Sequence, residues 1–295
     1  MLATTGIAGS GADIEAGEYA TSLADGFFRL GGNPDGTITA DIKGSADATY
    51  INQTADIIQR ILENQYNFDS TDMDLGSFAS LNTDNSSEVG IWVGAEQRSG
   101  LAVISELLVG VSGFGGFNRF NKFSVGIFKA ATGDSSLDFD KTNILKLEAI
   151  ELPRGLSPPN WRRQVGYQKN YTPQTDIAGS VADDHRAFIV EQYRISVSSD
   201  SSVLNNFTLA TDPPFVKGLY AQKADADTEA SRLLTLYKGK HHLFRIEMAF
   251  PFKLNINDVI KITYPRFGLD NGKLGRIVAL EDDADNYTST IEVFV

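Results

Sequence analysis

Residues 241–295 carry four short segments in which apolar and polar side chains alternate, and no other feature of the chain constrains the fold as much. In the first segment, Phe244, Ile246, Met248 and Phe250 alternate with polar residues such as Arg245. A period of two is typical of a strand with one buried face. The segments "DVIKITY", "KLGRIVAL" and "TSTIEVFV" follow after short turns. Together they predict a compact antiparallel sheet or barrel.

A tight turn is predicted inside "TYPRFGLDNGKLGRIVAL", residues 263–280. Asn271 and Gly272 both tolerate the positive φ that a two-residue type I′ turn needs, so we expect the hairpin to turn there. Pro265 has no backbone N–H to donate to a ladder. We therefore expect it at the start or at the edge of a strand.

Three amphipathic helices are predicted upstream of these strands. We expect Thr54 to cap the first helix and Ser99 the second, while Gly239 ends the third. Each helix carries an apolar stripe at helical spacing. The stripes are Ile57, Ile58, Ile61 and Leu62 in the first helix, Leu101, Ile104, Leu107 and Leu108 in the second, and Ala226, Ala230, Leu233, Leu234 and Tyr237 in the third.

Shorter elements are expected between the helices, from alternation and turn residues. They are strands at 27–30, 37–42 and 88–94, a hairpin around Asn121-Lys122, a strand that begins at Trp161, a short helix within 180–194 and an exposed loop at 195–215.

The predicted fold class is α+β, with a β-barrel-like antiparallel domain and an inserted small α+β lobe. We expect an N-terminal β segment at 1–44, the inserted lobe at 45–145, and a β-rich C-terminal domain with one long helix at 146–295.

Composition excludes several classes of function. The 295 residues carry a net charge of −12, which argues against a nucleic-acid binder because phosphate contacts need clustered Lys and Arg. The chain has no cysteine, and this excludes disulfides, thiolate nucleophiles and Cys-based metal sites. No run of about 18 apolar residues predicts a membrane span, and the N-terminus does not resemble a secretory signal.

Glycine-rich and acidic clusters are better explained as turns than as binding sites. The glycines of "GVSGFGGF", residues 110–117, follow a predicted helix, whereas a dinucleotide fingerprint opens one; we expect a helix end and a turn. Asp69, Asp72 and Asp74 lack the register of a calcium loop. We interpret them as a solvated loop, with a weak cation site as the alternative, and residues 281–285 as a hairpin loop.

Catalytic chemistry finds little support in the sequence. The three histidines are His185, His241 and His242. The adjacent pair lies on opposite faces of a strand and cannot easily share a metal. No G-x-S-x-G elbow occurs, and among the 38 acidic residues no carboxylate pair is distinguished. We expect no catalytic, cofactor-binding or metal-binding residue, no cofactor and no enzyme activity; the binding residues are not identified.

Aromatic residues leave one binding hypothesis open. Trp92 and Trp161, with neighbouring Phe and Tyr residues, could form a platform for sugars. The regular alternation of most aromatic residues favours packing in a core instead.

An ordered set of segments resembles tail proteins of tailed bacteriophages and prophages. The C-terminal "NINDVIKITYPRFGLDNGKLGRIVALEDDADNYTSTIEVFV" is similar to the closing segment of that family, in which a "GDVV.LTHPRFGL..G..FRV" run precedes a terminal strand. Earlier stretches agree in order, from "GGNPDGTITADIKG" through "GIWV", "RSGLAVISELL", "GFNRFNKFSVGIF" and "RRQVGYQKNYTPQTDIAGSV" to "DADTEASRLLTLY". The similarity covers most of the chain from about residue 25.

The resemblance implies a tail-tip (baseplate) hub, with a β-barrel frame and inserted α/β lobes. Such a hub is a homotrimer in the virion, assembled in the bacterial host cytoplasm, that links the tail tube to a fibre or spike and surrounds the DNA channel. Expected partners are the distal tail or tube protein, the fibre or spike and the tape measure, with DNA only in transit. The chain is short for a hub and lacks a full first barrel, which suggests a partial chain or a reduced member. A receptor- or glycan-binding tail module and a peptidoglycan hydrolase are the alternatives.

Overall fold

The structure of the chain is a computed structural model, which divides into two compact units, Met1–Ala48 and Thr49–Val295. The structure describes residues 3–4, 14–22, 27–34, 38–44, 49–177, 179, 181–249 and 253–295.

The first unit contains a three-stranded sheet of β1 (Ala3–Thr4), β2 (Glu18–Ser22) and β3 (Phe27–Leu30). β1 runs parallel to β2, and β2 pairs antiparallel with β3. The strand predicted at 37–42 is wrong over the residues that can be described, because 38–44 have no regular structure. Ile38 and Ile42 are exposed there. Alternation forms a strand only where a neighbouring strand supplies hydrogen-bond partners.

The second unit begins with three helices and a hairpin that share a first hydrophobic core. They are α1 (Thr54–Tyr66), α2 (Leu75–Asp84), α3 (Gly100–Gly110), β4 (Gly113–Phe117) and β5 (Phe123–Ile127). The predicted stripe of α1 is confirmed, since Ile58 and Leu62 are buried. The Ser99 hydroxyl caps α3 by accepting from the Ala102 amide, whereas Thr54 is the first residue of α1 and caps nothing. Hairpin formation around Asn121 is also confirmed.

Two predictions in this region are wrong, and a third is correct only in part. Residues 88–94 form no strand beyond a single bridge from Val89 to Tyr220. No helix is predicted at 75–84 from the sequence, yet α2 forms there, with Phe78 and Leu81 buried in the core. The segment 110–117 begins as predicted, with the end of α3 at Gly110 and a turn at 111–112, but its last five residues form β4. A Cβ on Gly115 would lie 2.9 Å from a methyl group of Leu108, so glycine lets the strand lie close to α3 without a shift of that side chain.

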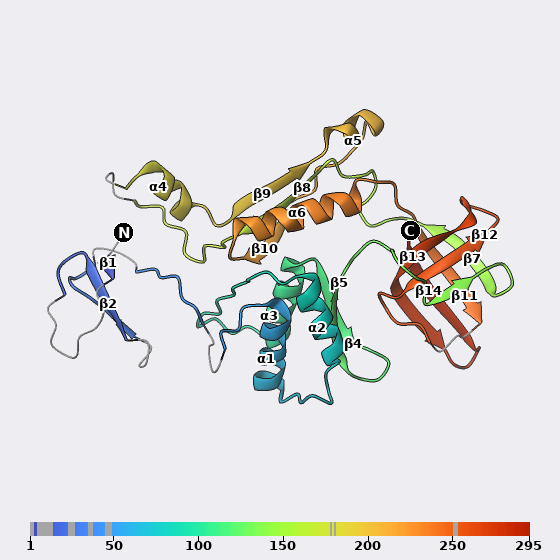
Figure 1. Ribbon diagram of the computed structural model, residues 1–295, viewed down its shortest axis with the longest axis horizontal. Coiled ribbons are helices and arrows are strands. Elements are labelled where there is room, and N and C mark those ends of the chain that lie inside the picture. Colours follow the sequence, from blue (N-terminus) through green and yellow to red (C-terminus); the bar gives the residue numbers. More distant parts are fainter. Residues whose placement is uncertain are drawn as a thin grey trace. The chain divides into compact units, whose positions relative to one another are not determined.

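A second, three-stranded sheet has the order β10-β8-β9. Its strands are β8 (Arg162–Tyr167), β9 (Arg194–Ser199) and β10 (Val216–Tyr220), and α6 (Lys223–Tyr237) packs along them (Figure 1). α4 (Asp183–Val190) lies in the long connection from β8 to β9. The helices predicted at 180–194 and 226–237 are confirmed.

The exposed loop predicted at 195–215 is wrong, because this segment contains most of β9 and all of α5 (Ser201–Asn206). The polar run in its centre has a structural role. The Asp200 carboxylate accepts hydrogen bonds from the amide and the hydroxyl of Ser202 and so caps α5.

The C-terminal strands form a curled, six-stranded sheet with the order β6-β12-β13-β14-β11-β7 (Figure 1). The strands are β6 (Leu137–Phe139), β7 (Ile144–Ile150), β11 (Leu243–Ala249), β12 (Val259–Tyr264), β13 (Leu269–Asp283) and β14 (Thr288–Phe294). Its buried face forms a second core that includes Phe244, Ile246 and Met248; Phe250 lies outside the described residues. The α+β fold class with a barrel-like antiparallel sheet is thus confirmed.

The hairpin predicted at 263–280 exists, but its turn lies earlier than expected. Tyr264 pairs with Leu269, so the chain turns through Pro265–Gly268, where Phe267 and Gly268 have positive φ. Asn271-Gly272 lies inside β13 at a shift of register. The buried side chain of Leu269 explains the difference. It joins the second core from the start of β13, and such long-range burial outweighs the local preference of Asn-Gly.

Candidate interaction surfaces

The acidic loop between α1 and α2 uses its carboxylates to hold its own turns. Asp69 accepts from the amide and the hydroxyl of Thr71, both at 2.6 Å, and Asp72 accepts from the Asp69 amide at 3.0 Å. These bonds lower the pKa of Asp69, the Thr71 hydroxyl contributing most. Asp74 immediately precedes α2. Within the described ranges, no three metal-ligating side chains come together as an ion site requires.

The second acidic cluster, 281–285, leads out of β13 into a hairpin, as the sequence indicated. The Asp283 carboxylate accepts from the amides of Asp285 and Asn286 at 3.0 Å. Hydrogen bonds from Asn286 are the main cause of the lowered pKa of Asp283. The cluster therefore forms a turn that joins β13 to β14.

The histidines lie in different environments. The ring of His241 stacks on Phe294 at 4.5 Å, and its Nε2 lies 2.6 Å from the Leu236 carbonyl oxygen. His242 stacks instead on Phe244 at 5.9 Å. Burial lowers the pKa of His241. His185 is exposed on α4, so the structure does not bring the three histidines into one site.

The two tryptophans are also separate, and for Trp92 the core-packing interpretation is wrong. Trp92 is 60% exposed, and its ring lies 5.6 Å from that of Tyr171. In the segment 88–94, only Val89 is bridged to a strand. No sheet pairing therefore directs the Trp92 side chain toward a core. Trp161 is half-buried at the start of β8, with the Arg162 guanidinium 5.0 Å from its ring.

Charged side chains surround the Trp92–Tyr171 pair. The Lys169 ammonium lies 4.5 Å from the centre of the Tyr171 ring and donates to Glu106 at 2.7 Å. Arg98 also donates to Glu106. Burial opposes ionisation of Glu106, but the hydrogen bonds from Lys169 and Arg98 outweigh it and lower the pKa of this carboxyl group. Glu106 therefore holds α3 to the connection that follows β8.

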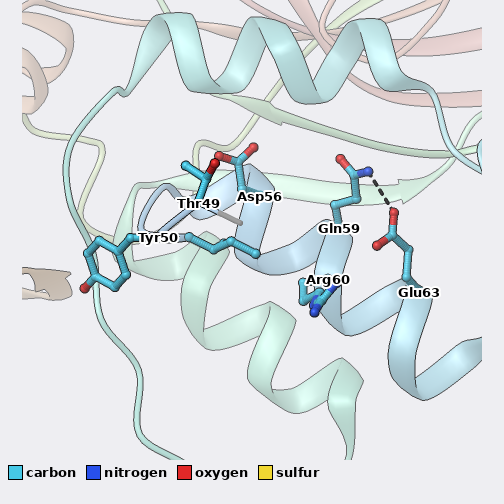
Figure 2. A pocket seen from close by; sticks show the side chains of 7 residues that line it. Thr49, Tyr50, Asp56, Gln59, Arg60 and Glu63 are labelled. Carbon is cyan, nitrogen blue, oxygen red and sulfur yellow. Dashed lines mark hydrogen bonds between the residues drawn. The ribbon is translucent and has the colours of Figure 1, made fainter. Parts of the chain in front are cut away.

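A hollow of about 240 Å³ lies beside the first turns of α1 (Figure 2). Its polar side chains bond mainly to one another or to the next helix. Gln59 donates to Glu63 at 2.8 Å, as Figure 2 shows, and Asp56 accepts from Asn82 of α2 at 2.7 Å. The Tyr50 ring points away from these groups. The residues described along its wall include a single cation, Arg60, and neither histidine nor cysteine.

A larger groove of about 430 Å³ lies between α3 and the β10-β8-β9 sheet. α3 contributes Ser105, Glu106 and Val109, and the sheet side contributes Tyr193 and Lys217. No local pattern in the sequence predicts this groove. The available signal was the composition of α3, whose apolar residues surround the helix instead of forming one stripe.

The six-stranded sheet has two open edges among the described residues, β6 and β7. On β7, Leu145 is exposed, and Lys146 and Glu148 form an ion pair at 2.8 Å. The neighbouring strand β11 carries Arg245, which pairs with Glu292 of β14. Open edges present unpaired N–H and C=O groups, which another chain can use.

Among the described helices, none is long and apolar enough to cross a lipid bilayer.

Comparison with known proteins gives structural likeness only. No protein-family profile matches the chain, and no curated protein matches its sequence. The fold is similar to a chain in the virion of the native gene transfer agent particle, with a TM-score of 0.49 and 13% identity over 81% of this chain and 46% of that one.

Two further similar structures are those of bacterial tail proteins. For the tail protein from Neisseria meningitidis MC58 the TM-score is 0.43, with 8% identity over 70% of this chain and 57% of that one. For the 43 kDa tail protein of prophage MuSo2 from Shewanella oneidensis it is 0.42, with 14% identity over 82% and 65%. The chain thus spans between about half and two thirds of the length of these proteins. All three structures are of virion or tail proteins.

Proposed function

We propose that the chain is a structural component of a bacteriophage tail tip or baseplate. In this proposal it forms a trimeric hub that links the tail tube to the host-contacting fibre or spike and surrounds the DNA channel. It resides in the virion after assembly in the bacterial host cytoplasm. Its partners are further copies of itself, the distal tail or tube protein, the fibre or spike and the tape measure, with DNA only in transit.

The observation that carries the proposal is the ordered sequence resemblance, which ends on the curled C-terminal sheet. The "PRFGL" stretch of the resemblance forms the β12–β13 turn and the start of β13. The sheet that contains it ends on two open edges, β6 and β7. A curled sheet with open edges is suited to a ring, because neighbouring copies can cover the edges that one chain leaves unpaired.

The charge of the chain agrees with a DNA conduit. A lumen that carries carboxylates repels phosphates, so DNA passes without binding. The net charge of −12 supplies such carboxylates. We therefore expect the lumen of the ring to be acidic, and a basic lumen would remove this argument.

Light scattering on the native complex tests the hub. The expected mass of the assembly is three times the 32.1 kDa of the chain. A map of the tail tip would show whether sheet edges and apolar surfaces form the contacts. A chain that stays monomeric at high concentration, and also with its tail partners present, contradicts the hub.

A second candidate function, receptor or glycan binding, is favoured by the exposure of Trp92 beside Tyr171. Exposed aromatic rings stack on the apolar faces of sugars. A glycan array tests this, with Trp92→Ala as the variant and the half-buried Trp161→Phe as its control. Binding that Trp92→Ala abolishes and Trp161→Phe preserves supports a receptor module; an array without signal argues against it.

We also propose that the chain has no catalytic activity. A zymogram on cell-wall material is expected to show no clearing. Clearing that disappears when one Asp or Glu is changed would identify a hydrolase.

A further inference from the structure

Helix α3 is apolar on two faces, but the described chain covers only one of them. Ile104, Leu107 and Leu108 are buried in the first core, whereas Leu101 is 61% and Val109 54% exposed. A helix that is apolar all round is normally covered all round. The outer face of α3 therefore has the composition of a contact surface.

The groove beside this face contains a cation that no described carboxylate neutralises. Tyr193 lines the groove and is 8% exposed. Lys217 is exposed at the same groove and forms no ion pair with any residue that the structure describes. Lys169, by contrast, is paired with Glu106. An exposed lysine without a paired carboxylate favours an occupant that presents carboxylates.

Helix α4 has the complementary properties. It has no buried residue, although short helices normally depend on packing for their stability. Asp183 and Asp184 form its first turn. Phe188 and Val190, near its end, are both exposed. An acidic start and an apolar end match a groove with a free lysine and exposed apolar residues on α3.

The α4 of the same chain is held outside the groove. The Arg194 guanidinium lies 3.5 Å from the centre of the Phe188 ring, and the Ile189 carbonyl oxygen accepts from Asn170 and Gln174. These contacts fix α4 to the arm between β8 and β9, beyond the strand ends (Figure 1). Arg194 covers one face of the Phe188 ring, but Phe188 stays 44% and Val190 43% exposed, and these surfaces can contact another molecule.

We propose that the α3 groove of one copy receives helix α4 of a neighbouring copy, with Lys217 facing Asp183 and Asp184 and with Leu101 and Val109 facing Phe188 and Val190. The contact joins two different surfaces of the chain, so it is head-to-tail and generates a ring when the rotation closes. The proposal rests on the self-association that the proposed function requires, and it names the surfaces that carry it.

Charge reversal tests the contact. Lys217→Glu, and separately Asp183→Lys with Asp184→Lys, should each weaken self-association roughly tenfold, because like charges then face one another. A chain that carries all three changes restores the opposite charges and should recover association. Lys273→Glu, at an exposed lysine of β13, is the matched control. Sedimentation velocity measures association, and melting temperatures show that every variant folds.

The outcomes separate this contact from the hub itself. If the chain is trimeric and Lys217→Glu associates as well as Lys273→Glu, the contact is wrong while the hub stands. If the chain alone is monomeric, a labelled peptide of residues 181–192 is titrated against it by fluorescence anisotropy. Saturable binding that Lys217→Glu weakens and Lys273→Glu preserves supports the contact, and the absence of such binding overturns it.

Discussion

At the residue scale, Arg276 of β13 is a buried cation that is satisfied by backbone oxygens instead of by a carboxylate. Its guanidinium donates to the carbonyl oxygens of Lys129 at 2.7 Å, Ala130 at 2.9 Å and Asn257 at 2.5 Å. Burial lowers the pKa of this side chain. The arginine therefore satisfies three carbonyl groups at a point where the chain passes from one core to the other.

We expect Arg276→Met to lower the free energy of unfolding by roughly 1–3 kcal/mol, because methionine leaves these buried oxygens without donors. Urea titration measures the change. Arg245→Met, at an exposed ion pair with Glu292, is the control and should change stability far less. Equal losses for the two variants would show that the carbonyl contacts contribute little.

His241 gives the stability of the chain a defined dependence on pH. In the unfolded chain its imidazole titrates near the ordinary value of 6.5, and burial in the folded chain lowers that pKa. Between the two values the unfolded state binds more protons, so the free energy of unfolding falls as the pH falls. The contribution is fully present above the unfolded pKa and is lost as the pH falls through the folded pKa.

His241→Phe keeps a ring to stack on Phe294 and removes the titration. We expect this variant to lose less stability than the wild type between about pH 7.5 and about pH 5. Urea midpoints at each pH measure the difference, with the exposed His185→Gln as the control. Parallel pH profiles for wild type and His241→Phe would contradict the assignment.

At the scale of elements, α6 is the clearest case in which a sequence stripe becomes a buried face. Leu233, in the middle of the stripe, is only 1% exposed and joins the first core with Ala226 and Ala230. We expect Leu233→Ala to cost roughly 2–5 kcal/mol in a denaturant titration, through lost burial and the cavity left behind. Leu209→Ala, at an exposed leucine, is the control. A loss below about 1 kcal/mol for Leu233→Ala would mean that the face is not packed in solution.

The elements that the sequence predicts correctly are those with a strong local period. α1, α6, β11, β12 and β14 belong to this group. The errors arise where distant contacts decide. Asn271-Gly272 has the local preference of a turn, but the burial of Leu269 moves the turn to Pro265–Gly268. Likewise, Val197 lies in a strand only because β8 supplies Gln164 as its partner.

At the scale of the whole molecule, the fold class was accessible from the sequence and the groove was not. Strand alternation after residue 241 and the helical stripes before it suffice for an α+β assignment. The groove, however, joins α3 to Tyr193 and to Lys217, which are far apart in the chain. Nothing in the local pattern brings them together, since their proximity depends on the β10-β8-β9 strand order.

The stretch 128–130 joins the first core to the six-stranded sheet, and arginines from both sides hold it. Arg232 of α6 donates to the Phe128 carbonyl oxygen at 2.7 Å, while Arg276 holds the next two carbonyl groups. Each arginine thus anchors the connecting stretch to its own core. Peeling this stretch away from either core would break charge-assisted hydrogen bonds. The segment between the two cores is therefore expected to resist proteolysis better than an ordinary exposed linker.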